Sequence, residues 1–180
     1  MNLKNHFELL ANYNQWMNPK IYDAAAQLSA DELAKDRGAF FGSILGTLNH
    51  IVVGDTIWLK RFATHPSCQV SLREIATLDN PTSLNQILFG DIAHLTEHRT
   101  WLDWQIIHWI SELTEDDLAV TLSYHNTKGI PASKRFSSLV LHFFNHQTHH
   151  RGQVSTLLSQ AGVVIGATDL LVQIPEESQA

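Results

Sequence analysis

The sequence predicts an all-α fold, an up-down four-helix bundle with a small β-hairpin inserted between the third and fourth helices. Apolar residues recur every three to four positions over four long stretches, which is the spacing of one helix face. Between the third and fourth stretches the pattern changes to alternation around a glycine-containing turn, as in a hairpin. The chain has 180 residues and is 44% hydrophobic, enough to bury one core as a single domain over residues 1–180.

The first helix is expected over residues 2–28. Its apolar side chains follow one another in alternating steps of four and three residues, which gives the period near 3.5 of a bundle seam. Asn14 interrupts this apolar row, so we expect it to face the interior as a buried hydrogen-bond partner or a pocket residue. Pro19 has no N–H to donate, so the helix should kink there or restart at Asn18.

The second helix is expected to begin near Ser43 and to end before Pro66. The segment that follows is mixed, with short helical potential around residues 71–76. A third helix is expected over residues 83–113, where leucine, isoleucine and tryptophan form an apolar stripe. The acidic run that begins at Thr114 should close it.

The hairpin and the fourth helix complete the bundle. Residues 118–124 and 130–136 flank a turn that contains a glycine, and the alternation in the first of these runs predicts a strand. The fourth helix is expected over residues 137–161, which contain no proline and one internal glycine. The tail should be irregular, and its end from about residue 175 should be disordered.

Two histidines of the fourth helix are the most informative residues. His146 and His150 are four residues apart, so they share one face of the helix. On an ideal helical wheel they fall inside the apolar stripe, beside His142 and Gln153. Two neighbouring imidazoles that face a core cannot both stay charged without cost, and neutral rings still need polar partners. A metal ion would satisfy both rings, and the alternative is a pair of hydrogen-bonded core histidines without metal.

A catalytic metal site usually has three protein ligands and one open position. His50 of the second helix is the best candidate for the third ligand, because its neighbours on the wheel form another core-facing stripe. Gly46 and Gly54 lie one turn to either side of it and each weakens the helix by roughly 1 kcal/mol relative to alanine. Room for a bound ligand would explain them, and close helix packing is an equally economical explanation.

The chain resembles the DinB family, whose members are metal-binding four-helix bundles related to bacillithiol and mycothiol S-transferases. The resemblance rests on His50, Asp55 and Trp58 in an early helix and on the ending H-x-x-x-H-R-G-Q over residues 146–153. It covers most of the chain, and the ending is its most specific part. In the family three histidines hold the metal, at positions that match His50 and the two histidines of the ending, and water usually takes the fourth position. The resemblance also implies a homodimer.

Four residues are expected around the three histidines without being ligands. His142 lies one turn before the histidine pair and is expected in the pocket wall or in hydrogen bonds to the ligands, with a plain core histidine as the alternative. Gln153 is expected to orient a ligand or the substrate. Trp58 is expected to wall the pocket, and Asn14 is the fourth such residue.

The resemblance implies one divalent transition metal ion, for which zinc or nickel is favoured and iron, manganese and copper are alternatives. Such an ion can bind a thiol or lower the pKa of bound water. The resemblance favours transfer of a low-molecular-weight thiol to a small electrophile, and metal-dependent hydrolysis is the second interpretation. The third is a non-catalytic metal-binding or structural dimeric bundle, which a fourth ligand such as His142 or Asp169 would support.

Composition excludes several other classes of function. The net charge of −6 and a pI near 5.9 argue against a nucleic-acid-binding protein, which would carry a basic face. No apolar run is long enough to span a membrane, the N-terminus lacks a signal-peptide core, and the single Cys68 cannot form an internal disulfide. We therefore expect a cytoplasmic protein. The absence of Glu-x-x-His and His-Glu-x-x-His motifs argues against di-iron and metalloprotease sites.

Overall fold

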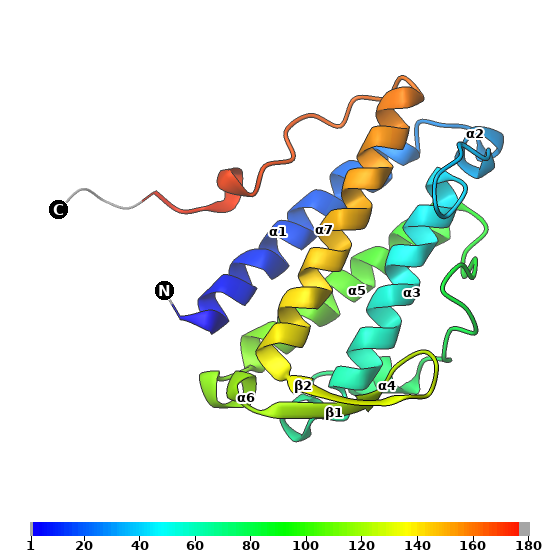
Figure 1. Ribbon diagram of the computed structural model, residues 1–180. Coiled ribbons are helices and arrows are strands. Elements are labelled where there is room, and N and C mark those ends of the chain that lie inside the picture. Colours follow the sequence, from blue (N-terminus) through cyan, green and yellow to red (C-terminus); the bar gives the residue numbers. More distant parts are fainter. Residues whose placement is uncertain (1, 177–180) are drawn as a thin grey trace.

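The computed structural model describes residues 2–176 and confirms a mostly helical fold with a small antiparallel hairpin (Figure 1). Four long helices form the bundle: α1 (Leu3–Ala25), α3 (Ile44–Phe62), α5 (Ile92–Glu112) and α7 (Phe136–Gln160). The shorter helical elements are α2 (Ala30–Ala34), η1 (Pro66–Cys68), α4 (Arg73–Thr77), α6 (Glu115–Ala119) and η2 (Leu170–Gln173). The expected disorder from residue 175 falls mainly outside the described residues.

The long helices pack through their apolar faces. Helix α1 lies against α5 and α7, and α3 lies against α7, so the two helices that carry the histidines are neighbours (Figure 1). Near the hairpin, the buried rings of Phe62, Trp109, Phe136 and Phe143 contact one another with centroids 5.1 to 6.4 Å apart. Aromatic pairs at such distances add to the stability of a core. Within residues 2–176, none of the helices is both long and apolar enough to cross a lipid bilayer.

Helix α1 differs from the prediction at Pro19. The helix continues through this residue without a restart at Asn18 and ends at Ala25. The Pro19 ring is exposed, whereas Asn18 is buried. Because the proline lies on the solvent side, its missing N–H removes no buried hydrogen bond from the core, and water can bond to the carbonyl left free.

The third long helix also differs from the prediction, because α5 begins later, after an irregular segment (residues 82–90). The buried side chain of Asn49 takes over the hydrogen bonds of this segment: its oxygen accepts from the N–H of Leu88 and Phe89 at 2.8 and 2.9 Å, and its amide donates to the Phe89 carbonyl at 3.0 Å. With these backbone groups of Leu88 and Phe89 satisfied from α3, this end of the segment does not need to be helical. Asp91 then caps the start of α5.

The predicted hairpin is present between α6 and α7. Strand β1 (Thr121–His125) pairs in antiparallel register with β2 (Pro131–Arg135). In the turn, the side chain of Asn126 accepts from the N–H of Lys128 and of Ile130, and Gly129 adopts a positive φ of 74°. The third helix ends at Glu112, directly before the acidic run expected to close it, and this run forms α6, which begins with a capping box.

Candidate metal centre

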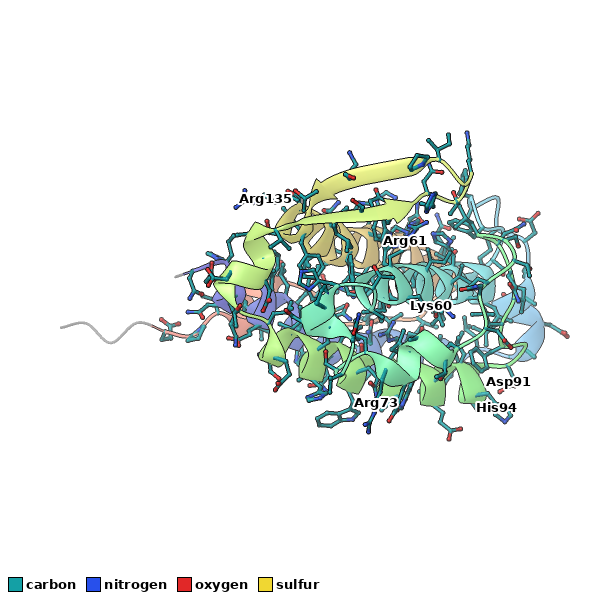
Figure 2. All side chains as sticks on the ribbon, turned by 90° about the horizontal axis from the view of Figure 1, so that it is seen from below. Lys60, Arg61, Arg73, Asp91, His94 and Arg135 are labelled. Carbon is teal, nitrogen blue, oxygen red and sulfur yellow. The ribbon has the colours of Figure 1, made fainter. Side chains whose placement is uncertain are left out.

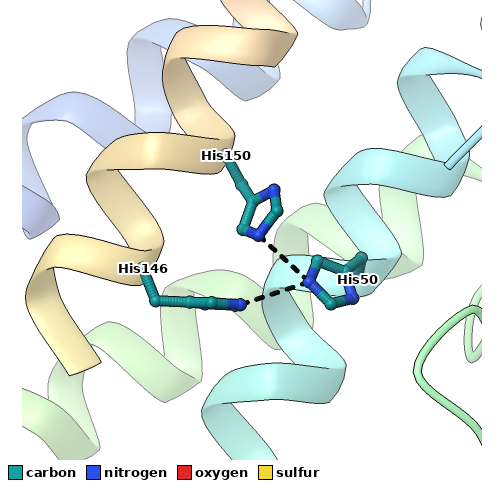
Figure 3. Close-up of side chains that lie close together, drawn as sticks. All are labelled: His50, His146 and His150. Atoms are coloured by element: carbon teal, nitrogen blue, oxygen red, sulfur yellow. Dashed lines mark hydrogen bonds between the residues drawn. The ribbon is translucent and has the colours of Figure 1, made fainter. Parts of the chain in front are cut away.

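Helices α3 and α7 bring the three predicted histidines together (Figure 3). Nε2 of His50 lies 3.2 Å from Nε2 of His146 and 3.2 Å from Nε2 of His150. Within residues 2–176 these residues are the one group of three or more His, Cys, Asp or Glu side chains close enough to share an ion. Imidazole nitrogens about 2.0–2.1 Å from a tetrahedral zinc ion are about 3.3 Å apart, so the observed spacing fits such an ion.

The outer nitrogens of two rings determine where their protons lie. Nδ1 of His50 is 2.7 Å from the carbonyl oxygen of Leu84, and Nδ1 of His150 is 2.7 Å from the side-chain oxygen of Gln153. Both oxygens only accept, so each Nδ1 carries the proton and each neutral ring presents a lone pair at Nε2. Two lone pairs that face each other at 3.2 Å cannot form a hydrogen bond, and a cation would satisfy both.

Burial keeps the rings neutral. It lowers the pKa of His50 to about 4, an effect that the hydrogen bond to Leu84 opposes. It lowers the pKa of His146 to about 3, with a further contribution from the neighbouring imidazoles. Neutral imidazole is the form that binds transition metals, so the pocket holds these rings ready for an ion at neutral pH.

The two glycines of α3 have different roles. A Cβ on Gly54 would lie 2.6 Å from Cε1 of His146, so this glycine makes room for the imidazole itself. A Cβ on Gly46 would lie 2.2 Å from the backbone oxygen of Phe41, so this glycine lets the preceding loop approach α3. Of the two explanations from the sequence, room at the site applies to Gly54, and close packing applies to Gly46.

Phe41 belongs to the site although the sequence did not single it out. Its ring stacks on that of His50, with centroids 3.6 Å apart and planes 16° apart, and its edge contacts His150. Phe41 therefore covers one side of the imidazole group. The only signal in the sequence is an aromatic pair in the loop just before Ser43, the residue that caps α3.

The structure places Trp58 and His142 in the wall of a cavity of about 270 Å³ beside the histidines. Their rings contact each other edge to face at 5.1 Å. The ring of His142 lies 6.1 Å from that of His146 and is not part of the three-histidine group. Gln153, the third expected neighbour, contacts His150 directly as described above.

Asn14 lies elsewhere in the core. It donates to a carboxylate oxygen of Asp103 at 3.2 Å and accepts a hydrogen bond from the guanidinium of Arg151. Of its two predicted roles, the structure therefore assigns it that of a buried hydrogen-bond partner. Through Arg151 it connects α1 to the turn of α7 that carries His150.

A buried ionic network lies behind the histidines. Asp55 of α3 accepts hydrogen bonds from the guanidinium of Arg99 and from the amide of Gln147, the latter at 2.7 Å. Arg99 also forms an ion pair with Asp103 at 2.9 Å. These four residues are buried, so the network connects α3, α5 and α7 in the interior. In the sequence only Asp55 had been singled out, and its partners in this network could not be predicted because they lie far away along the chain.

Comparison with known proteins identifies relatives of the whole chain. The model of the DinB family matches residues 1–179. Protein DinB of Bacillus subtilis (strain 168) is 26% identical over 160 residues, which cover 89% of this chain and 88% of that protein. No solved structure gives a significant match. The matched region contains all three histidines and the elements that position them.

Proposed function

This chain belongs to the DinB family, and from that premise we propose that His50, His146 and His150 hold one divalent transition metal ion. The observation that carries the proposal is the convergence of their Nε2 atoms, two of which are lone-pair donors because Leu84 and Gln153 accept from the opposite ring nitrogens. Zinc and nickel suit neutral imidazole, and iron, manganese and copper are alternatives.

The donor set supports a site that accepts a substrate. A structural zinc site is closed by four protein ligands, whereas a catalytic site keeps one position open. In the described part of the chain the group has three members, and neither His142 nor Asp169 joins it. The cavity beside His50 and His146 gives that open position space for a small molecule.

The reaction we propose is transfer of a small thiol to an electrophile. When bound, the metal ion would favour the thiolate form of a ligand thiol. The protein's single cysteine is not available for this role, because Cys68 is buried, its sulfur accepts from the Trp109 indole at 3.2 Å, and burial raises its pKa to about 11. The thiol would therefore be a substrate, in keeping with the resemblance to thiol transferases.

Other residues around the histidines would support this reaction by orienting the imidazole rings and by covering one side of them. The Leu84 carbonyl and Gln153 hold two imidazoles in one tautomer, while Phe41 covers one side of the group. Among the described residues, the lining of the adjacent cavity contains no aspartate or glutamate. His142 also lines this cavity and would be the general base for hydrolysis, so the preference for thiol transfer rests on the resemblance to thiol transferases.

Elemental analysis of protein purified without an affinity tag or chelator tests metal binding. We expect about one metal ion per chain in the wild type and its loss in His50→Ala, because two lone-pair donors cannot replace three. His94→Ala is the matched control, since His94 is exposed and outside the group, and it should keep the metal. Protein that takes up no metal even on reconstitution would contradict the proposal.

Thiol consumption by the metal-loaded protein tests the reaction separately. A panel of low-molecular-weight thiols is mixed with small electrophiles, and the loss of free thiol is followed with and without chelator. We expect consumption that depends on both metal and His50. Full metal loading with no metal-dependent consumption would leave the metal site in place and overturn the transferase proposal.

A further inference from the structure

Two neighbouring cavities lie beside the histidines and share part of their lining. The inner cavity of about 270 Å³ touches His50 and His146, and the outer one of about 830 Å³ lies between the end of α3, residues 80–84 and the hairpin. Six residues line both cavities: Ile57, Arg61, Leu84, Tyr124, Asn126 and Thr127. We call the combined space the hairpin cleft. The outer cavity by itself falls in the size range of small-molecule sites, roughly 300–1,000 Å³.

Arg61 lies where the two cavities meet. Its guanidinium is 4.7 Å from the centre of the Trp58 ring and 5.2 Å from that of Tyr124, so it is held between an α3 side chain and a β1 side chain. Figure 2 shows it between α3 and the hairpin. Stacking of this kind fixes the plane of a guanidinium and leaves its N–H edge free to donate.

No acidic side chain neutralises this guanidinium. Among the ion pairs and hydrogen bonds of residues 2–176, none involves the side chain of Arg61, although this side chain is half-buried. Burial lowers the pKa of Arg61, which is the cost of holding the charge partly out of water. An anionic ligand would offset that cost and use the free donors.

The charged residues of the whole cleft also favour an anionic ligand. Lys60 and Arg61 are the charged residues in the described lining of either cavity, which contains no aspartate or glutamate. Lys60 lines only the outer cavity, where its ammonium donates to the Leu78 carbonyl, whereas Arg61 lines both cavities. A cleft with positive and no acidic residues in its described lining favours an anionic ligand, although the chain as a whole has a net charge of −6.

We propose that the hairpin cleft binds a small carboxylate-bearing substrate, with its carboxylate on Arg61 and its reactive end beside His50 and His146. The proposal rests on the proposed function, which it deepens by naming a chemical class of substrate. A single guanidinium offers two parallel donors to one carboxylate, and the charges match one to one. In the described lining, Arg61 is the one lysine or arginine of the inner cavity, and this single positive charge suits a carboxylate better than a phosphate with close to two negative charges.

A pair of isosteric probes tests the proposal without any turnover. 3-Phenylpropanoate and its neutral amide, 3-phenylpropanamide, are titrated into the full-length protein, both metal-free and zinc-loaded. Binding is followed by NMR at the backbone amides of Asn126 and Thr127, which line the cleft. In wild type we expect the carboxylate to bind about tenfold more tightly than the amide, as for one charge-assisted hydrogen-bonded pair.

Arg61→Gln should remove this preference and leave the affinity for the amide unchanged. Arg73→Gln is the matched control, because Arg73 is an exposed arginine outside the cleft, and it should behave as wild type. If Arg61→Gln does not fold, as judged by circular dichroism, Arg61→Met replaces it, since methionine keeps an apolar stem against Trp58 and carries no charge.

Two outcomes would overturn the proposal. One is a wild type that binds acid and amide equally, and the other is a preference that survives in Arg61→Gln, as when the carboxylate binds the zinc ion instead. The test separates this proposal from the proposed function. A protein that consumes no thiol and still shows the Arg61-dependent preference would lose its assigned reaction and keep its carboxylate site.

Discussion

Gln153 contacts the candidate metal site without belonging to the three-histidine group. Its side-chain oxygen accepts from Nδ1 of His150 at 2.7 Å, as the Leu84 carbonyl does from Nδ1 of His50. Partners of this type set the tautomer of a ligating histidine, and their loss typically weakens metal binding by about 10–100-fold. Gly152, the neighbour of Gln153 in the ending, is exposed with open space around it, and nothing in the structure explains it.

The glycine that faces His146 gives a sharp test at the scale of one residue. In Gly54→Ala the new Cβ would lie 2.6 Å from Cε1 of His146, so the ring must move. We expect metal affinity to fall by about 10–100-fold, the effect of a misplaced ligand. The measurement is a zinc titration in competition with a chromophoric chelator.

Gly152→Ala is the matched control for this substitution. It adds the same methyl group to a helix, and no atom lies within 4 Å of the new Cβ. Its metal affinity should equal that of the wild type, and its stability should be unchanged or higher by up to about 1 kcal/mol from helix propensity. Wild-type zinc affinity in Gly54→Ala would show that the pocket tolerates the displaced ring.

At the scale of elements, the irregular segment 82–90 connects the fold to the site. It supplies the Leu84 carbonyl to His50, and Asn49 holds it against α3 with three hydrogen bonds to Leu88 and Phe89. Had these residues been helical, as the sequence predicted, the carbonyl of Leu84 would have bonded along its own helix. The orientation of His50 therefore depends on a departure from helical structure.

Asn49→Ala should affect both stability and metal binding. It leaves the N–H groups of Leu88 and Phe89 without their partner, at an expected loss of about 1–3 kcal/mol in the free energy of unfolding. Release of the segment should also weaken metal binding through Leu84 and His50. Urea unfolding and the zinc titration measure the two effects.

Asn12→Ala serves as the control, because Asn12 is an exposed residue of α1. It should leave both quantities within about 0.5 kcal/mol of the wild type. An Asn49→Ala protein that loses stability but binds zinc as tightly as the wild type would separate segment 82–90 from the orientation of His50.

At the scale of the whole molecule, the long helices are joined by buried charges as well as apolar contacts. Asp55 and Arg99 connect α3 to α5, Gln147 adds α7, and Arg151 connects α7 to α1 through Asn14. Removal of one partner from such a network leaves a buried charge uncompensated, whereas the intact network contributes to a single arrangement of helices. The helices that carry the histidines are thus held in one relative position.

Acid should destabilise the metal-free protein through its neutral imidazoles. The unfolded rings take up protons near pH 6.5, whereas burial lowers the pKa of His50 to about 4 and of His146 to about 3. The unfolded state then binds more protons between these values, so stability falls as the pH falls from about 6.5 towards 4. Urea unfolding of chelator-treated protein at pH 7 and pH 5 measures the loss.

The double variant His50→Ala/His146→Ala should lose less stability over the same pH interval, since it lacks the two shifted groups. Its comparison with the wild type isolates their effect from that of other titrating residues. An equal loss in both proteins would mean that these imidazoles do not titrate abnormally in the folded state.

The sequence by itself determined what depends on regular spacing. A period near 3.6 marked the four long helices, alternation marked the hairpin, and the same helical period placed His146 and His150 on one face. It also made His50 the best third histidine, because its neighbours formed a second core-facing stripe. These features follow from local geometry, in which each residue's direction is set by its position along one element.

Only the tertiary structure decided what depends on contacts between distant segments. Three contacts are of this kind, and residue spacing in the sequence does not predict any of them. They are the hydrogen bond between His50 and the Leu84 carbonyl, the stacking of Phe41 on His50, and the position of Arg61 between Trp58 and Tyr124. The late start of α5 has the same origin, since hydrogen bonds from Asn49 outweigh the helical pattern of residues 83–90. Local pattern thus predicted which three histidines converge, while long-range packing set their orientation and the cleft beside them.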